Sequence, residues 1–134
     1  MQALRVKVKG GYWFEIVLWP TRREMYAATG TDKRVLDKAG KKVEGMFIGE
    51  APQITPLRIS RFIGTIHLCK QALSLSTVIH EVYHAICDLE YKRNLRRAEK
   101  GLLPTLRMEE QYATILEQTI VGAVKALIGK QVQV

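Results

Sequence analysis

The pattern of hydrophobic and polar residues changes along the chain from a period of two to a helical period. Residues 4–9 alternate between apolar and basic side chains, and residues 12–19 are rich in aromatic and β-branched side chains. Alternation of this kind buries one face of a strand and leaves the other in solvent. Because Gly10 and Gly11 separate the two runs, this segment predicts a β-hairpin.

A short helix and two more strands are expected between the hairpin and residue 70. Thr21 and Glu24 form a capping box, which predicts a helix that ends near Gly30. Residues 43–48 predict a short strand. Residues 61–70 contain several β-branched and apolar residues and predict a longer strand.

Two long helices follow. From Ser74, apolar residues recur every three or four positions as far as Leu89, which predicts an amphipathic helix capped by Ser74 or Ser76. A basic stretch over residues 90–107 leads into a last helix over about residues 106–129. The order of elements predicts an α+β fold, in which a small mixed or antiparallel sheet packs on the two long helices.

Length and composition narrow the class of protein. The 134 residues fit one domain, so we expect a single domain over residues 1–134. The chain is 47% hydrophobic and 25% charged, which excludes disordered, collagen-like and disulfide-scaffold proteins. No apolar run approaches the roughly 18 residues of a membrane span, and residues 1–9 do not form a secretory signal. The two cysteines suit a reducing compartment, so a cytoplasmic protein is expected.

The clearest chemical signal is the sequence His80-Glu81-Val82-Tyr83-His84, an H-E-x-x-H motif within the first long helix. Residues i and i+4 lie about 5–6 Å apart on one helix face, so His80 and His84 can bind one metal ion together. Glu81 lies about 100° around the helix from His80. A carboxylate there can accept a proton from a metal-bound water. The motif therefore predicts a zinc site with Glu81 as general base.

A catalytic zinc site needs a third protein ligand, and the last helix offers Glu109 and Glu110. At 100° per residue, Glu109 falls on the face that carries the expected buried stripe. Glu110 falls on a face that looks solvated. Glu109 is therefore expected to point inward and to bind the metal, with Glu110 as the alternative. The expected buried stripe consists of Tyr112, Ala113, Leu116 and Ile120.

An H-E-x-x-H motif followed by a glutamate on the next helix resembles the gluzincin branch of the zincin metallopeptidases. Residues 80–88 are similar to the active-site helix of thermolysin. The short chain and the Glu109-Glu110 pair are more similar to the compact zincins of phages and prophages, and the ImmA/IrrE-type and SprT-like peptidases are related comparisons. The resemblance covers about residues 60–125.

The resemblance implies a set of roles for these residues. It implies His80, His84 and Glu109 as zinc ligands and Glu81 as the catalytic base. It also implies an edge strand, here at about residues 63–69, to which an extended peptide substrate could pair.

The chain departs from the thermolysin pattern in two places. Where thermolysin-like enzymes have an aspartate that orients a ligand histidine, this chain has Ala113, so another group such as Asp88 or a backbone carbonyl must do so. The tyrosine and histidine that stabilise the oxyanion in large gluzincins have no counterpart. Tyr112, Tyr83 and His67 are the alternatives for that role.

The chain is also strongly basic, with 21 Lys and Arg against 13 Asp and Glu and a net charge of +8. A cluster of these charges follows the metal-binding helix segment, over Lys92–Lys100. It is either a solvated face or a contact for an anionic partner, such as nucleic acid or an acidic protein.

Taken together, the residues predict a zinc-dependent metallopeptidase that acts on a protein or peptide substrate. The metal would lower the pKa of a bound water toward about 7, and Glu81 would accept that water's proton. The alternative is a phage-type interaction or nucleic-acid-binding protein whose zinc site is structural or vestigial. A metal-dependent hydrolase for a different substrate is a third possibility.

Overall fold

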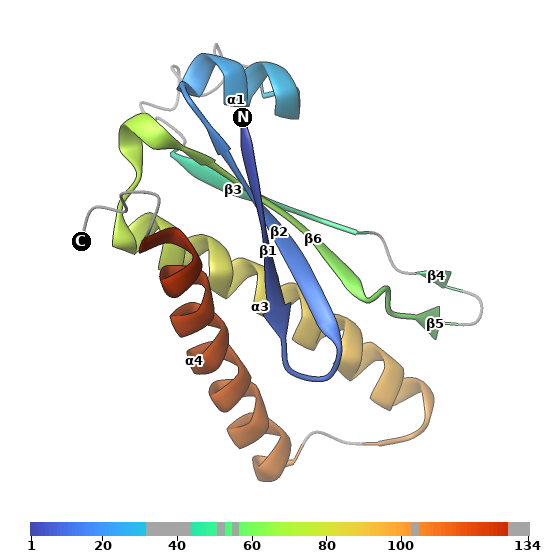
Figure 1. Ribbon diagram of the computed structural model, residues 1–134. Coiled ribbons are helices and arrows are strands. Elements are labelled where there is room, and N and C mark those ends of the chain that lie inside the picture. The colour runs from blue at the N-terminus through green and yellow to red at the C-terminus, as the bar shows by residue number, and fades with distance from the viewer. Residues whose placement is uncertain (32–43, 51–52, 55–56, 103–104, 129–134) are drawn as a thin grey trace, which may run out of the picture.

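The structure is a computed structural model that describes residues 1–31, 44–50, 53–54, 57–102 and 105–128. As predicted, the fold is α+β: within these residues, a four-stranded mixed sheet carries three α-helices (Figure 1). A separate pair of two-residue strands lies between β3 and β6 in the chain. The elements are β1 (Gln2–Val8), β2 (Tyr12–Trp19), α1 (Arg22–Thr29), β3 (Gly45–Gly49), β4 (Gln53–Ile54), β5 (Leu57–Arg58), β6 (Phe62–Cys69), the 3-10 turn η1 (Lys70–Ala72), α3 (Leu75–Glu99) and α4 (Leu106–Ile128).

The strand order in the sheet is β1-β2-β6-β3. The predicted hairpin is confirmed, since β1 and β2 pair antiparallel from Gln2–Leu18 to Val8–Tyr12. β6 pairs parallel with β2 and antiparallel with β3. The expectation that residues 63–69 form an edge strand is wrong, because β6 is paired on both sides. Strand order depends on contacts between distant segments, and the apolar pattern of β6 suits an internal strand equally well.

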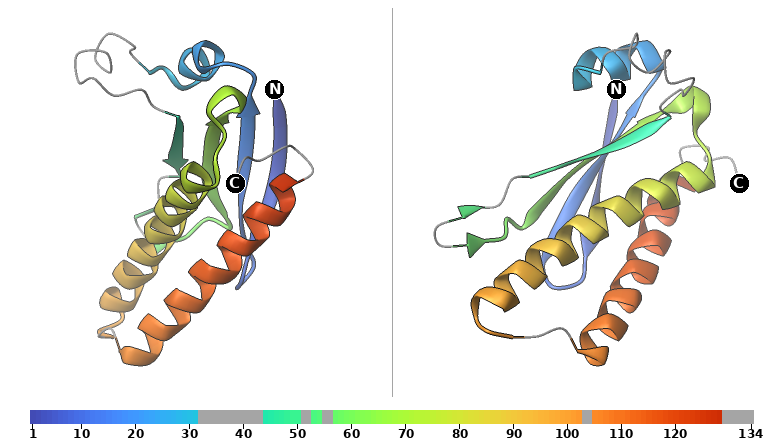
Figure 2. Two further views of the ribbon diagram at one scale, coloured as in Figure 1. Left: turned by 90° about the vertical axis from the view of Figure 1, so that its left-hand side faces the viewer. Right: turned by 180° about the vertical axis from the view of Figure 1, so that it is seen from behind.

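One face of the sheet packs against α3 and α4. Seen from behind, α3 crosses in front of the strands (Figure 2), and α4 packs against both α3 and β1. Alternate residues of β1 and β2 point into this core, including Val6, Phe14 and Ile16, and they meet Val82 and Ile86 of α3. A half-buried strand has this alternation, since successive side chains point to opposite faces. The sheet and both long helices therefore share one hydrophobic core.

The opposite face of the sheet is covered at one end by α1. Met25 and Tyr26 of α1 pack on Cys69, with Trp19 and Met46 beside them. The predicted cap is confirmed: Thr21 Oγ1 accepts a hydrogen bond from the Glu24 backbone N–H at 3.2 Å. The helix ends at Gly30, whose φ of 69° is a left-handed conformation that favours glycine.

The helix that carries the motif is longer than the sequence pattern predicted. α3 continues ten residues past Leu89, through most of the basic stretch, and ends before Gly101 with its φ of 74°. Residues 90–99 contain no glycine or proline, so nothing in the backbone ends the helix earlier. The last helix starts at Leu106 as predicted. Its predicted end at Gly129, and Val43 at the predicted start of the short strand, lie outside the described residues.

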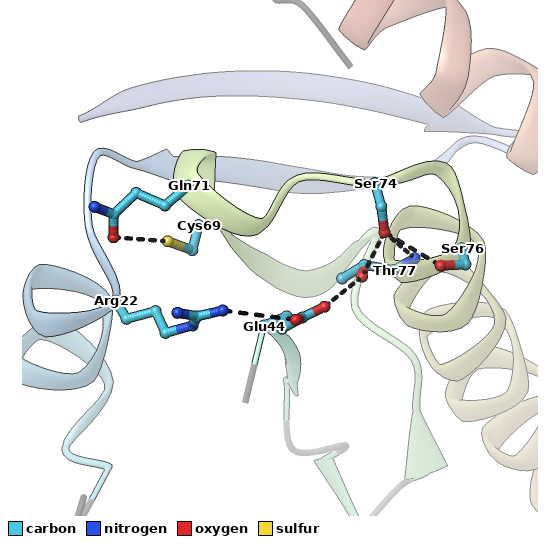
Figure 3. A network of polar contacts seen from close by, with 7 residues as sticks. All are labelled: Arg22, Glu44, Cys69, Gln71, Ser74, Ser76 and Thr77. Carbon is cyan, nitrogen blue, oxygen red and sulfur yellow. Dashed lines mark hydrogen bonds and ion pairs between the residues drawn. The ribbon is translucent and has the colours of Figure 1, made fainter. Parts of the chain in front are cut away.

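A polar network holds the start of α3 beside α1 and the residue preceding β3 (Figure 3). Ser74, not Ser76, caps α3, because its Oγ accepts the Thr77 N–H at 3.3 Å. Glu44 accepts a hydrogen bond from Thr77 Oγ1 at 3.3 Å and lies 3.6 Å from Arg22 of α1. These contacts fix where β3 begins relative to the first turn of α3. Among the described helices, none is long and apolar enough to cross a membrane.

Candidate metal centre

The H-E-x-x-H motif lies in the middle of α3, where helix geometry brings both histidines to one exposed face. The Nε2 atoms of His80 and His84 are 3.0 Å apart, and their ring centroids are 4.6 Å apart. Two nitrogen ligands of one tetrahedral zinc ion are separated by about 3.3 Å, given Zn–N bonds of about 2.0–2.1 Å. The two imidazoles therefore have a spacing that suits a shared metal ion.

Glu81 lies beside this pair but is buried, with 6% of its surface exposed. Its Oε1 atom is 4.0 Å from His80 Nε2. Burial raises the pKa of the Glu81 carboxyl, while the two histidines and a hydrogen bond from the Phe47 backbone act in the opposite direction. The carboxyl group is thus held between the histidine pair and strand β3.

A cleft of about 740 Å³ opens between α3 and β3 next to these groups. β3 approaches α3 closely because it begins and ends with glycine: a Cβ on Gly45 would lie 3.2 Å from the Glu81 Cγ, and one on Gly49 would lie 3.1 Å from an Asp88 oxygen. Larger residues at these two positions would push the strand away. The cleft is lined by Gly45, Met46, Phe47, Gly49, Glu81, His84, Cys87, Asp88 and Tyr91.

Glu109 does not lie on the buried face of α4, where the repeat of 100° per residue predicted it. The prediction that it points inward is wrong: Glu109 and Ala113 are exposed, while Tyr112, Leu116 and Ile120 lie at the margin of the buried face. The buried stripe of α4 is offset by a few residues, because α4 packs on both α3 and β1 and this contact turns a different face inward. That stripe consists of Ile115, Thr119, Ala123 and Leu127.

Glu109 and Glu110 of α4 line two cavities other than the cleft, although the Glu109 cavity shares Cys87 and Tyr91 with it. Glu109 lines a cavity of about 620 Å³ with Cys87, Glu90 and Asn94, and Glu110 lines another beside Arg93. In the part of the chain that the structure describes, no three His, Cys, Asp or Glu side chains come together in positions to hold one metal ion. The structure therefore brings His80, Glu81 and His84 together and does not bring Glu109 or Glu110 to them.

The groups suggested for support roles have other partners. Asp88, a possible partner for a ligand imidazole, pairs with Lys92 at 2.7 Å. The Tyr112 hydroxyl is 2.9 Å from Cys87 Sγ, and burial, followed by this hydrogen bond, raises the pKa of Tyr112. His67 points away from α3 and accepts a hydrogen bond from the Trp19 indole at 2.9 Å. Of the three oxyanion alternatives, only Tyr83, which is exposed and adjacent to His84, is next to the histidine pair.

Sequence reasoning missed two features of the site. The first is Lys92, which is 7% exposed and bonds to both Asp88 and the Glu50 carbonyl. Its spacing of four residues from Asp88 on a helix was a usable signal. The second is the approach of β3, whose Phe47 backbone reaches Glu81, and for this the glycines at 45 and 49 were the available signal.

The basic segment Lys92–Lys100 does not form one continuous cationic face. Lys92 is buried against Asp88, and Arg97 bonds to Glu90 at 2.9 Å and to Asn94 at 2.8 Å. Arg93 turns toward the hairpin and lies over the Tyr12 ring at 6.0 Å. Lys92 and Arg97 are thus held in ion pairs within α3, Arg93 lies at the hairpin, and Arg96 and Lys100 are exposed.

Comparisons of the chain with known protein families, with curated proteins and with solved structures find no match. The resemblance to the gluzincins therefore depends on the motif and its placement on α3.

Proposed function

We propose that this protein is a zinc-dependent peptidase of the gluzincin type. The observation that carries the proposal is the arrangement on α3: the Nε2 atoms of His80 and His84 lie 3.0 Å apart on an exposed face, and the carboxylate of Glu81 lies buried beside them. Exposure leaves room for a metal and a substrate, while the buried carboxylate can act on a proton at the same place. Two free cysteines, Cys69 and Cys87, support a cytoplasmic location for this protein.

Three residues of α3 would each have a separate role in peptide hydrolysis. His80 and His84 would hold the zinc, which when bound supplies a Lewis acid. Glu81 would accept a proton from the attacking water and return it to the leaving amine. Burial raises the pKa of Glu81, and a nearby cation would favour its ionised form.

β3, and not β6, would align the substrate. Within the described residues, β3 pairs only with β6, so its other side is a free edge beside the cleft. An extended peptide could add to such an edge through backbone hydrogen bonds. This would place a scissile peptide bond over Glu81, to which the Phe47 backbone already bonds.

The test combines elemental analysis with a Glu81→Gln variant. We expect about one zinc per chain in the wild-type protein, and hydrolysis of an unstructured protein such as casein. Glu81→Gln keeps the shape of the side chain and removes its basicity, so it should retain zinc and lose activity by about 10²–10⁴-fold. Glu117→Gln, an exposed position on α4, is the matched control and should behave as wild type.

Two further variants test the third ligand. Zinc loss in Glu109→Ala but not in Glu110→Ala would identify Glu109, and would require the first turn of α4 to approach the histidine pair. A wild-type protein that neither contains nor takes up zinc would refute the proposed site. A Glu81→Gln variant that cleaves at the wild-type rate would refute the mechanism.

The second candidate is an interaction or nucleic-acid-binding protein with a structural or vestigial zinc site. It is favoured by the absence, within the described residues, of a third ligand beside His80 and His84. It predicts that zinc binds without any hydrolysis and that Glu81→Gln changes nothing but the local packing.

A further inference from the structure

Six basic side chains from four segments of the chain gather around the tip of the β1–β2 hairpin. We call them the tip surface. None of the six forms an ion pair within the described part of the chain. Two acidic residues are placed beside them: Glu15 pairs in register with Arg5, and Glu110 lines a cavity with Lys9, Arg93 and Arg107. The tip surface consists of Arg5, Lys7, Lys9, Arg61, Arg93 and Arg107.

The first part of the tip surface lies on the face of the sheet opposite α3 and α4. Because Phe14 and Val6 point into the core, their neighbours Trp13, Arg5 and Lys7 point to the other face. The guanidinium of Arg5 lies 3.8 Å from the Trp13 ring centroid. Among the described helices only α1 lies on this face, and it covers the far end, at Trp19 and Cys69 (Figure 1).

An aromatic pair accompanies these charges. Trp13 and Phe62 lie opposite each other on β2 and β6, with ring centroids 4.6 Å apart. Both are only partly buried, and Lys7 pairs in register with Trp13 on its other side. Rings flanked by cations on an open sheet can stack with bases while the cations contact phosphates.

The second part of the tip surface continues around the hairpin to the helix side. Arg61 donates a hydrogen bond to the Gly10 carbonyl at 2.7 Å, and its guanidinium lies 5.4 Å from the Tyr12 ring. Arg93 of α3 approaches the same ring. A cavity of about 410 Å³ between the hairpin and α4 brings together Lys9, Arg93 and Arg107. The cations of the tip surface therefore lie on both sides of the hairpin tip.

We propose that the tip surface binds single-stranded nucleic acid. Six cations without an ion-pair partner among the described residues give charge complementarity to a phosphate backbone. Partly exposed aromatic rings such as Trp13 and Phe62 can stack with unpaired bases, whose faces are accessible, and not with the bases inside a duplex. The surface lies along β1, at the opposite edge of the sheet from β3 and the cleft, so this inference is independent of the peptidase proposal.

The test measures binding of a fluorescently labelled single-stranded DNA of about 20 nucleotides at several salt concentrations, beside the duplex of the same sequence. The double variant Lys7→Gln/Lys9→Gln should bind the single strand at least about 10-fold more weakly at low salt and should flatten the salt slope by about 1.4 units. Trp13→Leu should weaken binding by about 5- to 150-fold through lost stacking.

The control removes the same charge elsewhere. Arg23→Gln/Lys125→Gln alters exposed residues of α1 and the last turns of α4, and it should retain the wild-type affinity within about 2-fold. Equal weakening by both double variants would show a general charge effect and overturn the proposal. So would tighter binding of the duplex, equally tight binding of polyglutamate, or no binding of the single strand at low salt.

Discussion

Gly64 is the residue at which the sheet has least room. Its φ of 151° lies outside the range that side-chain-bearing residues favour, and a Cβ there would lie 2.3 Å from the Ile48 carbonyl oxygen. The register between β2 and β6 also shifts at this point, between Trp13 and Glu15. Gly64 thus occupies a bulge that lets β6 pair with both neighbours.

Replacing Gly64 with alanine should lower the free energy of unfolding by about 2 kcal/mol or more, because the backbone or β3 must move. Urea unfolding of both proteins measures the difference. Gly122→Ala is the matched control: nothing lies within 4 Å of a Cβ at that position of α4. This control should gain about 0.5–1 kcal/mol from helix propensity. An unchanged midpoint for Gly64→Ala would mean that the bulge does not need glycine.

At the scale of elements, the main question is what holds β3 against α3. Lys92 spans the two: its ammonium group bonds to Asp88 one turn earlier on α3 and to the Glu50 carbonyl directly after β3. Its side chain is 9% exposed, so these bonds are largely shielded from water. Removing one partner of such a set leaves the others unsatisfied, which costs more than the bond itself contributed.

Lys92→Met should therefore destabilise the protein by about 2 kcal/mol, although it keeps the length of the side chain. Lys125→Met, at an exposed position of α4, should change the free energy of unfolding by less than about 0.5 kcal/mol. Thermal unfolding followed by circular dichroism gives both values. If the two variants were equally stable, the Lys92 contacts would contribute nothing to the docking of β3.

At the scale of the whole molecule, one core joins the sheet to both long helices. The buried cluster contains residues of β1, β2, β6, α3 and α4. The apolar face of each of these elements is therefore buried only by packing against the others. Small domains with one such core generally unfold in a single cooperative transition.

Both tryptophans, Trp13 and Trp19, are on β2, while most of the helical signal comes from α3 and α4. Tryptophan fluorescence and far-ultraviolet circular dichroism should therefore give the same urea midpoint. Phe14→Ala, at a fully buried position, should shift both midpoints together, with a loss of about 3–5 kcal/mol. Two separate midpoints would show that the helices and the sheet unfold independently.

The sequence by itself was sufficient to predict the features that depend on residues close together in the chain. The alternation of apolar and polar residues predicted the hairpin, and the Thr21–Glu24 capping box and Gly30 predicted the two ends of α1. The spacing of His80 and His84 predicted two imidazoles on one helix face. Each depends on contacts within about four residues, where backbone geometry alone sets the distances. The α+β fold class followed from the order of these elements.

The tertiary structure decided the features that depend on which helices and strands pack against one another. Strand order put β3, and not β6, at the edge beside Glu81, because pairing joins segments far apart in the chain. The packing of α4 on α3 and β1 exposed Glu109, which helix phase alone had placed inward. Likewise, Arg93 joined Lys9 at the hairpin while Arg97 paired with Glu90, although both arginines belong to one basic run. The helical repeat gives the angle between two residues around a helix. Which face of the helix is buried depends on the surface against which the helix packs.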